Sequence, residues 1–362
     1  MKRSLTSKVA AALAAGLAIA TLSAGTGTAA TPAPTLPKLK NAKVVRVGFF
    51  ANVTHGSALI AQEKKFFERY LKNTKIEYVA FNAGPAVIEA MKGGSIDISF
   101  IGPNPAVAGY VSTRGSLLRI VAGSTTGGAQ FITKQNITTV ADLKGKTFAT
   151  PQLGNTQDVA LRSYLKSKGY TTSILGSGDV NIAPTANAST LDLFKNGSID
   201  GAWVPEPWAS RLVLEANGRV FLDEKSLWPK GKFVTTNIIA TQSFLKSYPG
   251  TVRSLLQAVQ YTNTWTKANA AAAKDAVQNQ LLKWSGKKLS DEVINRAWPS
   301  LTFTLDPVAA QLADSTDAAV EAGTLTNVGS RGIAGIYDLR LLNQLMKFQK
   351  KKTYKAAGLG LV

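Results

Sequence analysis

The chain has 362 residues, 45% of them hydrophobic, and is therefore long enough to form two or three domains with apolar cores. Its 42 Lys and Arg against 22 Asp and Glu give a formal net charge of +20, which suits an anionic partner: nucleic acid, an anionic cell envelope or an anionic ligand. There is no cysteine, which excludes disulfides, thiolate metal sites, a cysteine nucleophile and lipidation of an N-terminal cysteine.

Residues 1–30 have the composition of a secretory signal peptide. Basic residues come first, an apolar run covers residues 9–22, and small residues end in Thr28-Ala29-Ala30. A membrane anchor is the alternative, but this run is shorter than the about 20 apolar residues that a bilayer span requires. We therefore expect export to the periplasm or the cell surface. Gly25 stands where a lipoprotein processing box has its lipidated cysteine, so we expect no lipid anchor through cysteine.

The dense basic run of the sequence lies near its C-terminal end, at residues 347–355. No motif of interleaved basic and aromatic residues accompanies it, so we expect no nucleic-acid partner. Electrostatic contact with an anionic cell envelope explains the positive charge as well and suits an exported protein. We call residues 347–362 the basic tail.

Strands and helices are expected to alternate along the first part of the chain. A Pro- and Lys-rich linker is expected at residues 31–43. The apolar patterns that follow predict a strand at 44–50, a helix at 57–71, a strand at 76–81, a helix from Pro85 through Met91, and a strand at 97–101. This alternation is typical of a parallel, doubly wound sheet.

An internal similarity predicts two lobes. Residues 92–105 and 195–207 both contain Gly-Ser-Ile-Asp, then an apolar strand and Pro-x-Pro, with Asn104 in the first copy and Glu206 in the second. A β-rich run at 233–241 is expected to cross back to the first lobe. The expected division is lobe 1 at 44–128 and 233–346, lobe 2 at 129–232, helices over 242–325, and a terminal helix at 336–348.

Five loops are expected to line a cleft between the two lobes. In an open α/β sheet, ligands bind beyond the carboxyl ends of the strands. Three such loops belong to the first lobe and two to the second. These loops are residues 51–56, 82–85, 102–105, 152–158 and 204–208.

Residues 145–165 predict a short strand, a polar turn and an amphipathic helix. Asn155 and Thr156 stand where they can cap this helix, whose apolar face begins at Val159. The unpaired N–H groups and the dipole of a helix start can bind an anion without a charged side chain. Plain capping of an ordinary helix is the alternative interpretation.

The residues that could carry catalysis are few. His55 is the one histidine, so a metal cluster of His or Cys cannot be assembled, and no Gly-x-Ser-x-Gly, P-loop or Gly-x-Gly-x-x-Gly motif is present. Asp158 and Glu206 could meet across the cleft as an acid/base pair. Each also has a simpler role, because Asp158 favours the helix dipole and Glu206 can accept hydrogen bonds from a ligand or from the other lobe. We therefore expect no enzyme, no cofactor and no metal site.

Groups suited to binding a small molecule are better represented. Apolar walls with a few convergent polar groups suit a ligand with one anionic end. Each candidate also has a structural role: Trp203 can be part of the core, His55 can cap its loop, and Trp208 can anchor its helix. The polar candidates are His55, Gly84, Asn104, Asn155, Thr156 and Gln157, and the apolar ones are Phe50, Trp203 and Trp208.

Five stretches together resemble a known family. They are Gly48-Phe-Phe-Ala-Asn-Val-Thr-His55, Gly84-Pro-Ala-Val-Ile-Glu-Ala-Met91, Asp97-Ile-Ser-Phe-Ile-Gly-Pro-Asn-Pro105, Gly154-Asn-Thr-Gln-Asp-Val-Ala-Leu-Arg162 and Asp200-Gly-Ala-Trp-Val-Pro-Glu-Pro-Trp208. This combination resembles the solute-binding proteins of the nitrate/sulfonate/taurine family of ABC importers, and within it most closely the aliphatic-sulfonate-binding proteins. The resemblance covers about residues 44–325.

The resemblance implies a fold and a set of ligand contacts. The fold is the two-lobed type II periplasmic-binding-protein fold, an α/β fold that closes on its ligand in a cleft between the lobes. The sulfonate would lie near Gly84, Asn104, Asn155 and Thr156, and the organic part near His55, Trp203 and Glu206.

The resemblance also implies a function. The protein would be the monomeric binding component of an ABC importer, would capture a small organic anion, an aliphatic sulfonate or taurine, and would deliver it to a membrane permease. Alternatives are a binding protein for nitrate or a thiamine-pyrimidine precursor, an enzyme of pyrimidine formation on the same fold that uses His55, and a basic adhesion protein.

Overall fold

The computed structural model describes residues 35–326, 328 and 332–361. The chain divides into two compact units, residues 1–35 and 36–362, and only the second is described below. The expected signal peptide and residues 31–34 of the expected linker lie outside the described residues. Among the described residues, no helix combines the length and the apolar character that a membrane crossing would need.

The larger of two sheets has six strands in the order β11-β4-β10-β3-β1-β2. Strand β1 runs parallel to both β2 and β3, with Val44 opposite Lys75 and Val47 opposite Ile98. Strand β10 runs antiparallel to its neighbours β3 and β4, and β11 runs antiparallel to β4. The strands are β1 (Val44–Phe50), β2 (Lys75–Phe81), β3 (Ile98–Ile101), β4 (Leu118–Gly127), β10 (Val234–Thr241) and β11 (Leu301–Phe303).

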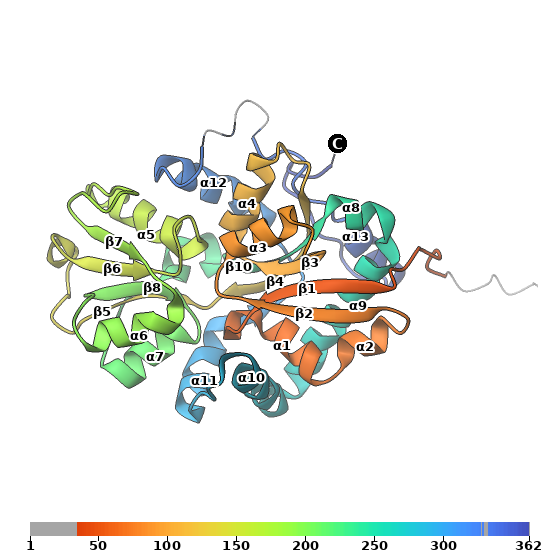
Figure 1. The fold of residues 1–362 in the computed structure, drawn as a ribbon, viewed down its shortest axis with the longest axis horizontal. Coiled ribbons are helices and arrows are strands. Elements are labelled where there is room, and N and C mark those ends of the chain that lie inside the picture. The colour runs from red at the N-terminus through yellow and green to blue at the C-terminus, as the bar shows by residue number, and fades with distance from the viewer. Residues whose placement is uncertain (1–34, 327, 329–331, 362) are drawn as a thin grey trace, which may run out of the picture. The chain divides into compact units, whose positions relative to one another are not determined.

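Helices cover both faces of this sheet (Figure 1). The strands β3 and β10 are buried along their whole length, as expected for strands covered on both sides. One face carries α3 (Gly84–Lys92) and α4 (Pro103–Ser112). The other carries α1 (Gly56–Glu63), α2 (Phe66–Tyr70), α9 (Pro249–Ala268) and α10 (Ala270–Ser285).

The second sheet has five strands in the order β7-β6-β8-β5-β9. Trp203 and Phe131 stack in its core with ring centroids 5.4 Å apart. Figure 1 shows α5 on one face and α6 and α7 on the other. The elements are β5 (Ala129–Thr133), β6 (Thr147–Thr150), β7 (Asn181–Pro184), β8 (Gly201–Pro205), β9 (Arg219–Asp223), α5 (Thr156–Ser167), α6 (Asn187–Lys195) and α7 (Trp208–Ala216).

The chain passes between the sheets twice. It leaves β4 and enters β5 through Gly127 and Gly128, whose φ angles are +76° and +78°. It returns from β9 to β10 through residues 224–233. The N–H of Gly127 donates to the carbonyl oxygen of Phe233 at 3.1 Å, so the two crossings lie side by side. Glycine is required at 127 for a second reason, because a Cβ there would lie 2.3 Å from the carbonyl oxygen of Ser300.

The observed elements correct three expectations. The sheets are mixed rather than parallel, because the two strands next to the crossings, β5 and β10, run opposite to their neighbours. The helix expected at 57–71 is broken, because Lys65 adopts φ +55° and separates α1 from α2. The region expected to be helical over 242–325 also contains β11, which pairs with β4.

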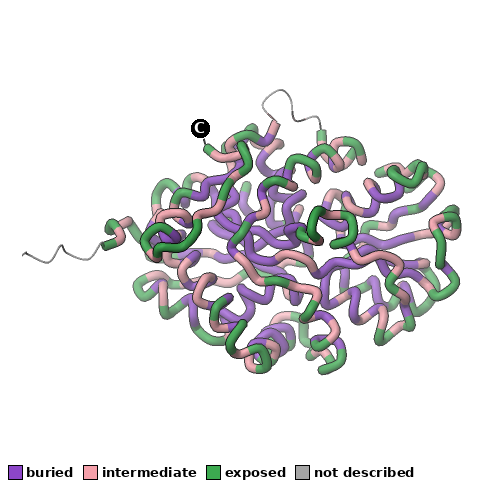
Figure 2. Tube along the Cα trace, turned by 180° about the vertical axis from the view of Figure 1, so that it is seen from behind, coloured by how far each residue is buried: buried purple, intermediate pink, exposed green. Residues whose placement is uncertain are grey.

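The remaining helices complete the fold, and the basic tail folds back onto the last of them. The terminal helix begins at Arg340 rather than at 336, and the side chain of Asn343 bonds both backbone groups of Tyr354, at 2.8 and 2.9 Å. Figure 2 shows buried residues along the strands and exposed ones on outer helices and turns. The remaining helices are α8 (Gln242–Ser247), α11 (Asp291–Ala297), α12 (Leu312–Glu321) and the terminal helix α13 (Arg340–Phe348).

Candidate functional site

A small cavity lies where the loops of the two sheets meet. The space open to water in it is about 20 Å³, which is room for about one water molecule. Loops after β1, β2 and β3 line it from one side, and the ends of β7 and β8 with the start of α5 line it from the other. The lining residues are Phe50, Asn52, Thr54, His55, Asn82, Gly102, Asn155, Thr156, Gln157, Asn187, Pro205 and Thr235.

His55 is an uncharged hydrogen-bond donor in this cavity. It is 2% exposed, and burial lowers the pKa of its imidazole to about 3. Its Nδ1 accepts a hydrogen bond from the N–H of Phe50 at 3.2 Å. A neutral imidazole whose Nδ1 accepts must carry its proton on Nε2. His55 is therefore held in the tautomer that can donate from Nε2.

The start of α5 presents polar groups that have no partner of their own. Asn155 is the N-cap residue, yet its side chain makes no capping hydrogen bond. The N–H of Asp158 is bonded to the carbonyl oxygen of Asn155, so the N–H groups of Thr156 and Gln157 precede the first bond of the helix. Among the described residues, the buried Oγ1 of Thr156 and the buried Oδ1 of Asn187 have no hydrogen-bond partner.

A buried ion pair fixes the turn before α5. Asp158 and Arg162 are 0% and 1% exposed, with Nε of Arg162 3.0 Å from Oδ2 of Asp158. The same carboxylate accepts from the hydroxyl of Thr150 at 2.8 Å and from the N–H of Gly154 at 2.9 Å. The end of β6, the turn and the first turn of α5 are thus bound to one carboxylate. Asp158 positions the helix start and is not free for acid/base chemistry.

A wider opening adjoins the small cavity and carries positive charge. The two share Asn52, Asn82 and Asn187, and the space open to water in the wider part is about 630 Å³. The indole Nε1 of Trp208 donates to Oδ1 of Asn52 at 2.8 Å. The lining of this opening, which we call the mouth, includes Trp208, Arg211, Glu215, Trp284, Lys287 and Lys288.

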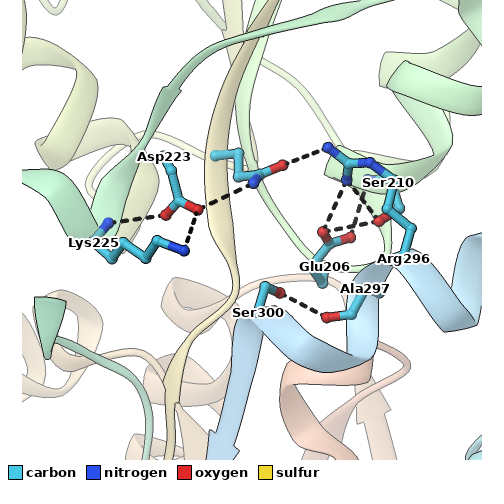
Figure 3. A network of polar contacts seen from close by, with 8 residues as sticks. Glu206, Ser210, Asp223, Lys225, Arg296, Ala297 and Ser300 are labelled. Carbon is cyan, nitrogen blue, oxygen red and sulfur yellow. Dashed lines mark hydrogen bonds and ion pairs between the residues drawn. The ribbon is translucent and has the colours of Figure 1, made fainter.

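Two predicted ligand contacts lie elsewhere. Trp203 is fully buried in the core of the second sheet, where its Nε1 donates to the carboxylate of Glu224 at 2.7 Å. The carboxylate of Glu206 accepts from the N–H and hydroxyl of Ser210 at 3.0 and 2.9 Å, and Arg296 lies 3.4 Å from it (Figure 3). Burial raises the pKa of Glu206, and the bonds from Ser210 and the charge of Arg296 oppose this. Neither side chain lines the cavity: Trp203 belongs to the core and Glu206 contacts the other half of the chain, which were the alternatives to ligand binding for these two residues.

Two further candidates, Gly84 and Asn104, are not among the residues that line the cavity. The amide of Asn104 donates to the carbonyl oxygen of Ser315 and accepts from its hydroxyl, both at 3.0 Å. Both polar atoms of this side chain are therefore bonded to Ser315 of α12. Gly84 begins α3 in contact with Pro105, and a Cβ at Gly84 would lie 2.3 Å from that ring. Of the polar candidates, the structure brings together His55, Asn155, Thr156 and Gln157.

The structure adds two polar residues that the sequence patterns did not indicate. Asn187 begins α6 directly after β7, a strand-to-helix junction of the kind that marked the other loops. Thr235 lies on β10, which was expected only to cross between lobes. Among the described residues, no three His, Asp or Glu side chains gather in a way that could hold a metal ion.

Comparison with known proteins gives a family and several named relatives. The model of the NMT1-like family matches residues 39–280. The "Putative binding protein" of Brucella abortus (strain 2308) is 25% identical over 69% of this chain and 75% of its own. The "Putative aliphatic sulfonates-binding protein" of Bacillus subtilis (strain 168) is 24% identical over 77% of this chain and 81% of its own.

A solved structure shares the fold. It is the alkanesulfonate-binding protein SsuA from Xanthomonas axonopodis pv. citri bound to MOPS, with a TM-score of 0.65 and 22% identity over 80% of this chain and 96% of that one. The α/β fold with two sheets, expected as a type II periplasmic-binding-protein fold, is thereby confirmed.

Proposed function

The chain belongs to the NMT1-like family, and on this premise we propose that it is the exported solute-binding component of an ABC importer. Its ligand is a small organic anion, an aliphatic sulfonate or taurine, which it delivers to a membrane permease. The observation that carries the proposal is the cavity at the start of α5, where the Oγ1 of Thr156 is buried without a partner. Relatives named as sulfonate-binding proteins support the ligand class.

An anion would be held by neutral donors. The N–H groups of Thr156 and Gln157, the hydroxyl of Thr156 and Nε2 of His55 converge on one buried space. None of the Lys and Arg residues that the structure describes lines it. Hydrogen bonds to a charged group are stronger than those between neutral groups, and the dipole of α5 adds to them. The anion would satisfy groups that are otherwise buried without partners.

The ligand enters by separation of the two halves of the chain. Space for about one water molecule cannot hold a sulfonate with its organic group. We propose that residues 44–128 with 233–346 form one lobe, that 129–232 form the other, and that they open at the paired crossings near Gly127. The basic mouth, with Arg211, Lys287 and Lys288, attracts the anion before closure.

The protein acts without catalysis, as a monomer, and needs no cofactor. Asp158 and Glu206 are each engaged in an ion pair of their own, with Arg162 and Arg296, which leaves no free acid/base pair in the cavity. The exposed lysines of the basic tail, at 347, 350, 351, 352 and 355, make electrostatic contact with an anionic cell envelope.

Calorimetry with ethanesulfonate, taurine, nitrate and sulfate tests the ligand class. We expect saturable binding of one alkanesulfonate per chain. Thr156→Val removes one hydroxyl at nearly constant volume and should weaken binding at least about tenfold, as loss of a hydrogen bond to a charged group does. The matched control is Thr262→Val, a buried threonine in α9 outside the cavity, with affinity unchanged. Absence of saturable binding to the whole panel would refute the proposal.

A further inference from the structure

A second and larger cavity lies between α5 and α12. It is separate from the small anion cavity, although Thr156 at the start of α5 lines both. The space open to water in it is about 270 Å³, near the lower end of the range for small-molecule sites. Its walls are mostly apolar and aromatic. They include Val159, Tyr164, Trp228, Phe233 and Leu312.

Four polar side chains in this wall have a buried atom without a hydrogen-bond partner among the described residues: Thr156, Trp228, Asn237 and Gln311. Asn237 lies on β10, is 0% exposed and lines the cavity. In the part of the chain that the structure describes, neither its Oδ1 nor its Nδ2 has a hydrogen-bond partner. Leaving a buried donor and acceptor unsatisfied destabilises the fold, because both groups have lost their hydrogen bonds to water. By contrast, the amide of Asn104 at the rim of the same cavity is fully bonded to Ser315.

The charge of the lining excludes an anion. Within the part of the chain that the structure describes, no Lys or Arg lines this cavity. The ionisable acids in the wall are Glu224 and Asp314. Burial raises the pKa of Glu224 to about 7, with the hydrogen bond from Trp203 opposing. An anion would meet the carboxylate of Asp314, and that of Glu224 above neutral pH, with no Lys or Arg of the described residues in the wall to compensate, whereas an uncharged molecule would not.

We propose that this cavity binds an uncharged ring compound that carries a hydrogen-bond donor and acceptor side by side. The amide edge of Asn237 pairs with that donor and acceptor, and the aromatic walls enclose the ring. This pairing supplies both missing hydrogen bonds of Asn237 at once. The site goes beyond the proposed anion binding, because neither Asn237 nor the aromatic walls line the anion cavity.

Lactams and a matched anion are suitable probes. ε-Caprolactam and 2-pyridone present an amide edge on a ring, and hexanoate carries a carboxylate on a similar number of carbons. We expect saturable binding of a lactam or pyridone to the full chain by calorimetry, with a shift of the Trp228 indole N–H signal in ¹⁵N-labelled protein. Hexanoate should bind at least tenfold more weakly.

Two variants locate the binding. Asn237→Leu removes the amide at similar volume, and Ala160→Phe fills the cavity from α5. Each should weaken lactam binding at least tenfold, while Ala141→Phe, at an exposed position outside the cavity, should not. Asn237→Leu removes an amide that has no hydrogen-bond partner, so the melting temperature of the variant should not fall. An unchanged melting temperature would show that any loss of lactam binding is not caused by misfolding.

The outcomes separate this site from the anion site. Ethanesulfonate binding should be unchanged in Asn237→Leu, whether or not lactams bind. If no lactam or pyridone binds saturably, the cavity holds only water and the proposal is overturned. It is also overturned if both variants bind the lactam as tightly as the unaltered chain, or if hexanoate binds equally well.

Discussion

Arg296 of α11 places its Nη1 3.4 Å from Oε1 of Glu206, which follows β8 of the other sheet. The same nitrogen lies 2.9 Å from the hydroxyl of Ser210, and Nη2 donates to Oε1 of Gln130 at 2.9 Å (Figure 3). Glu206 is 0% exposed, so its charge depends on this cation and on Ser210. Helix α11 is thereby bound to strand β5, to the residue that follows β8 and to helix α7.

Removing the cation should therefore be costly. Arg296→Met keeps much of the side chain's bulk but leaves the buried carboxylate of Glu206 without its counter-charge. We expect the free energy of unfolding to fall by about 2 kcal/mol or more, since truncating one partner of a buried pair leaves the other charge unpaired.

Lys166→Met is the control for this prediction. Lys166 pairs with Glu321 between α5 and α12, but both side chains are more than half exposed, so the change should cost less than about 1 kcal/mol. Denaturant unfolding of the two variants measures the difference. Equal losses in the free energy of unfolding would show that the buried ion pair stabilises the fold no more than the exposed one.

The sequence could predict site residues that follow from local patterns, but not contacts between residues far apart in the chain. His55, Asn155, Thr156 and Gln157 follow predicted strand ends or begin a predicted helix, so local patterns sufficed to bring them to one cavity. For Glu206 the sequence could not decide between a ligand contact and a contact with the other lobe, because its partner Arg296 is 90 residues away and carries no motif.

The same reason accounts for the other differences. Asn104 is turned to Ser315, 211 residues later, by a contact that no periodicity reveals. The mixed direction of the sheets depends on which strands the crossing segments join, and strand periodicity does not contain that information. The α/β class was predictable because alternating strands and helices are a local signal.

Gly127 at the first crossing should not tolerate a side chain. It has φ +76°, and an added Cβ would lie 2.3 Å from the backbone oxygen of Ser300. Gly127→Ala should lower the free energy of unfolding by more than the about 1 kcal/mol that a left-handed conformation costs an alanine. Gly145→Ala is a matched control, because Gly145 has φ +71° with no atom within 4 Å of the added Cβ. Similar losses in thermal or denaturant unfolding would contradict the steric argument.

The carboxyl group of Glu224 should make the fold less stable as the pH rises. Its pKa is about 7 in the folded chain, raised by burial, against 4.5 for an exposed glutamate. Between these values the folded chain holds a proton that the unfolded chain has released, so the free energy of unfolding falls by at most about 1.4 kcal/mol per pH unit. Glu224→Gln keeps an acceptor for Trp203 and removes this loss. The variant should gain stability over the unaltered chain from pH 5 to pH 8, and a constant difference would refute the assignment.

His55 should make the fold less stable as the pH falls, which is the opposite direction to Glu224. Its pKa is about 3 in the folded chain and 6.5 in an exposed histidine, because burial disfavours the charged ring. As the pH falls from 6.5 towards 3, the unfolded chain takes up a proton that the folded chain does not, so stability falls with it. His55→Asn, whose Oδ1 can accept from the N–H of Phe50, should remove this part of the acid sensitivity in unfolding measured at pH 4 and pH 7.

The same neutral state makes a prediction for ligand binding. If His55 donates from Nε2 as a neutral ring, the affinity for ethanesulfonate should vary less than about twofold between pH 5 and pH 8. A site that used a protonated imidazole would instead lose affinity as the pH rose through the pKa of the bound histidine. Calorimetry at three pH values in the unaltered chain distinguishes the two, with the His55→Asn variant as the reference that cannot titrate there. A tenfold loss above pH 7 in the unaltered chain alone would show that the ligand is held by a charged His55.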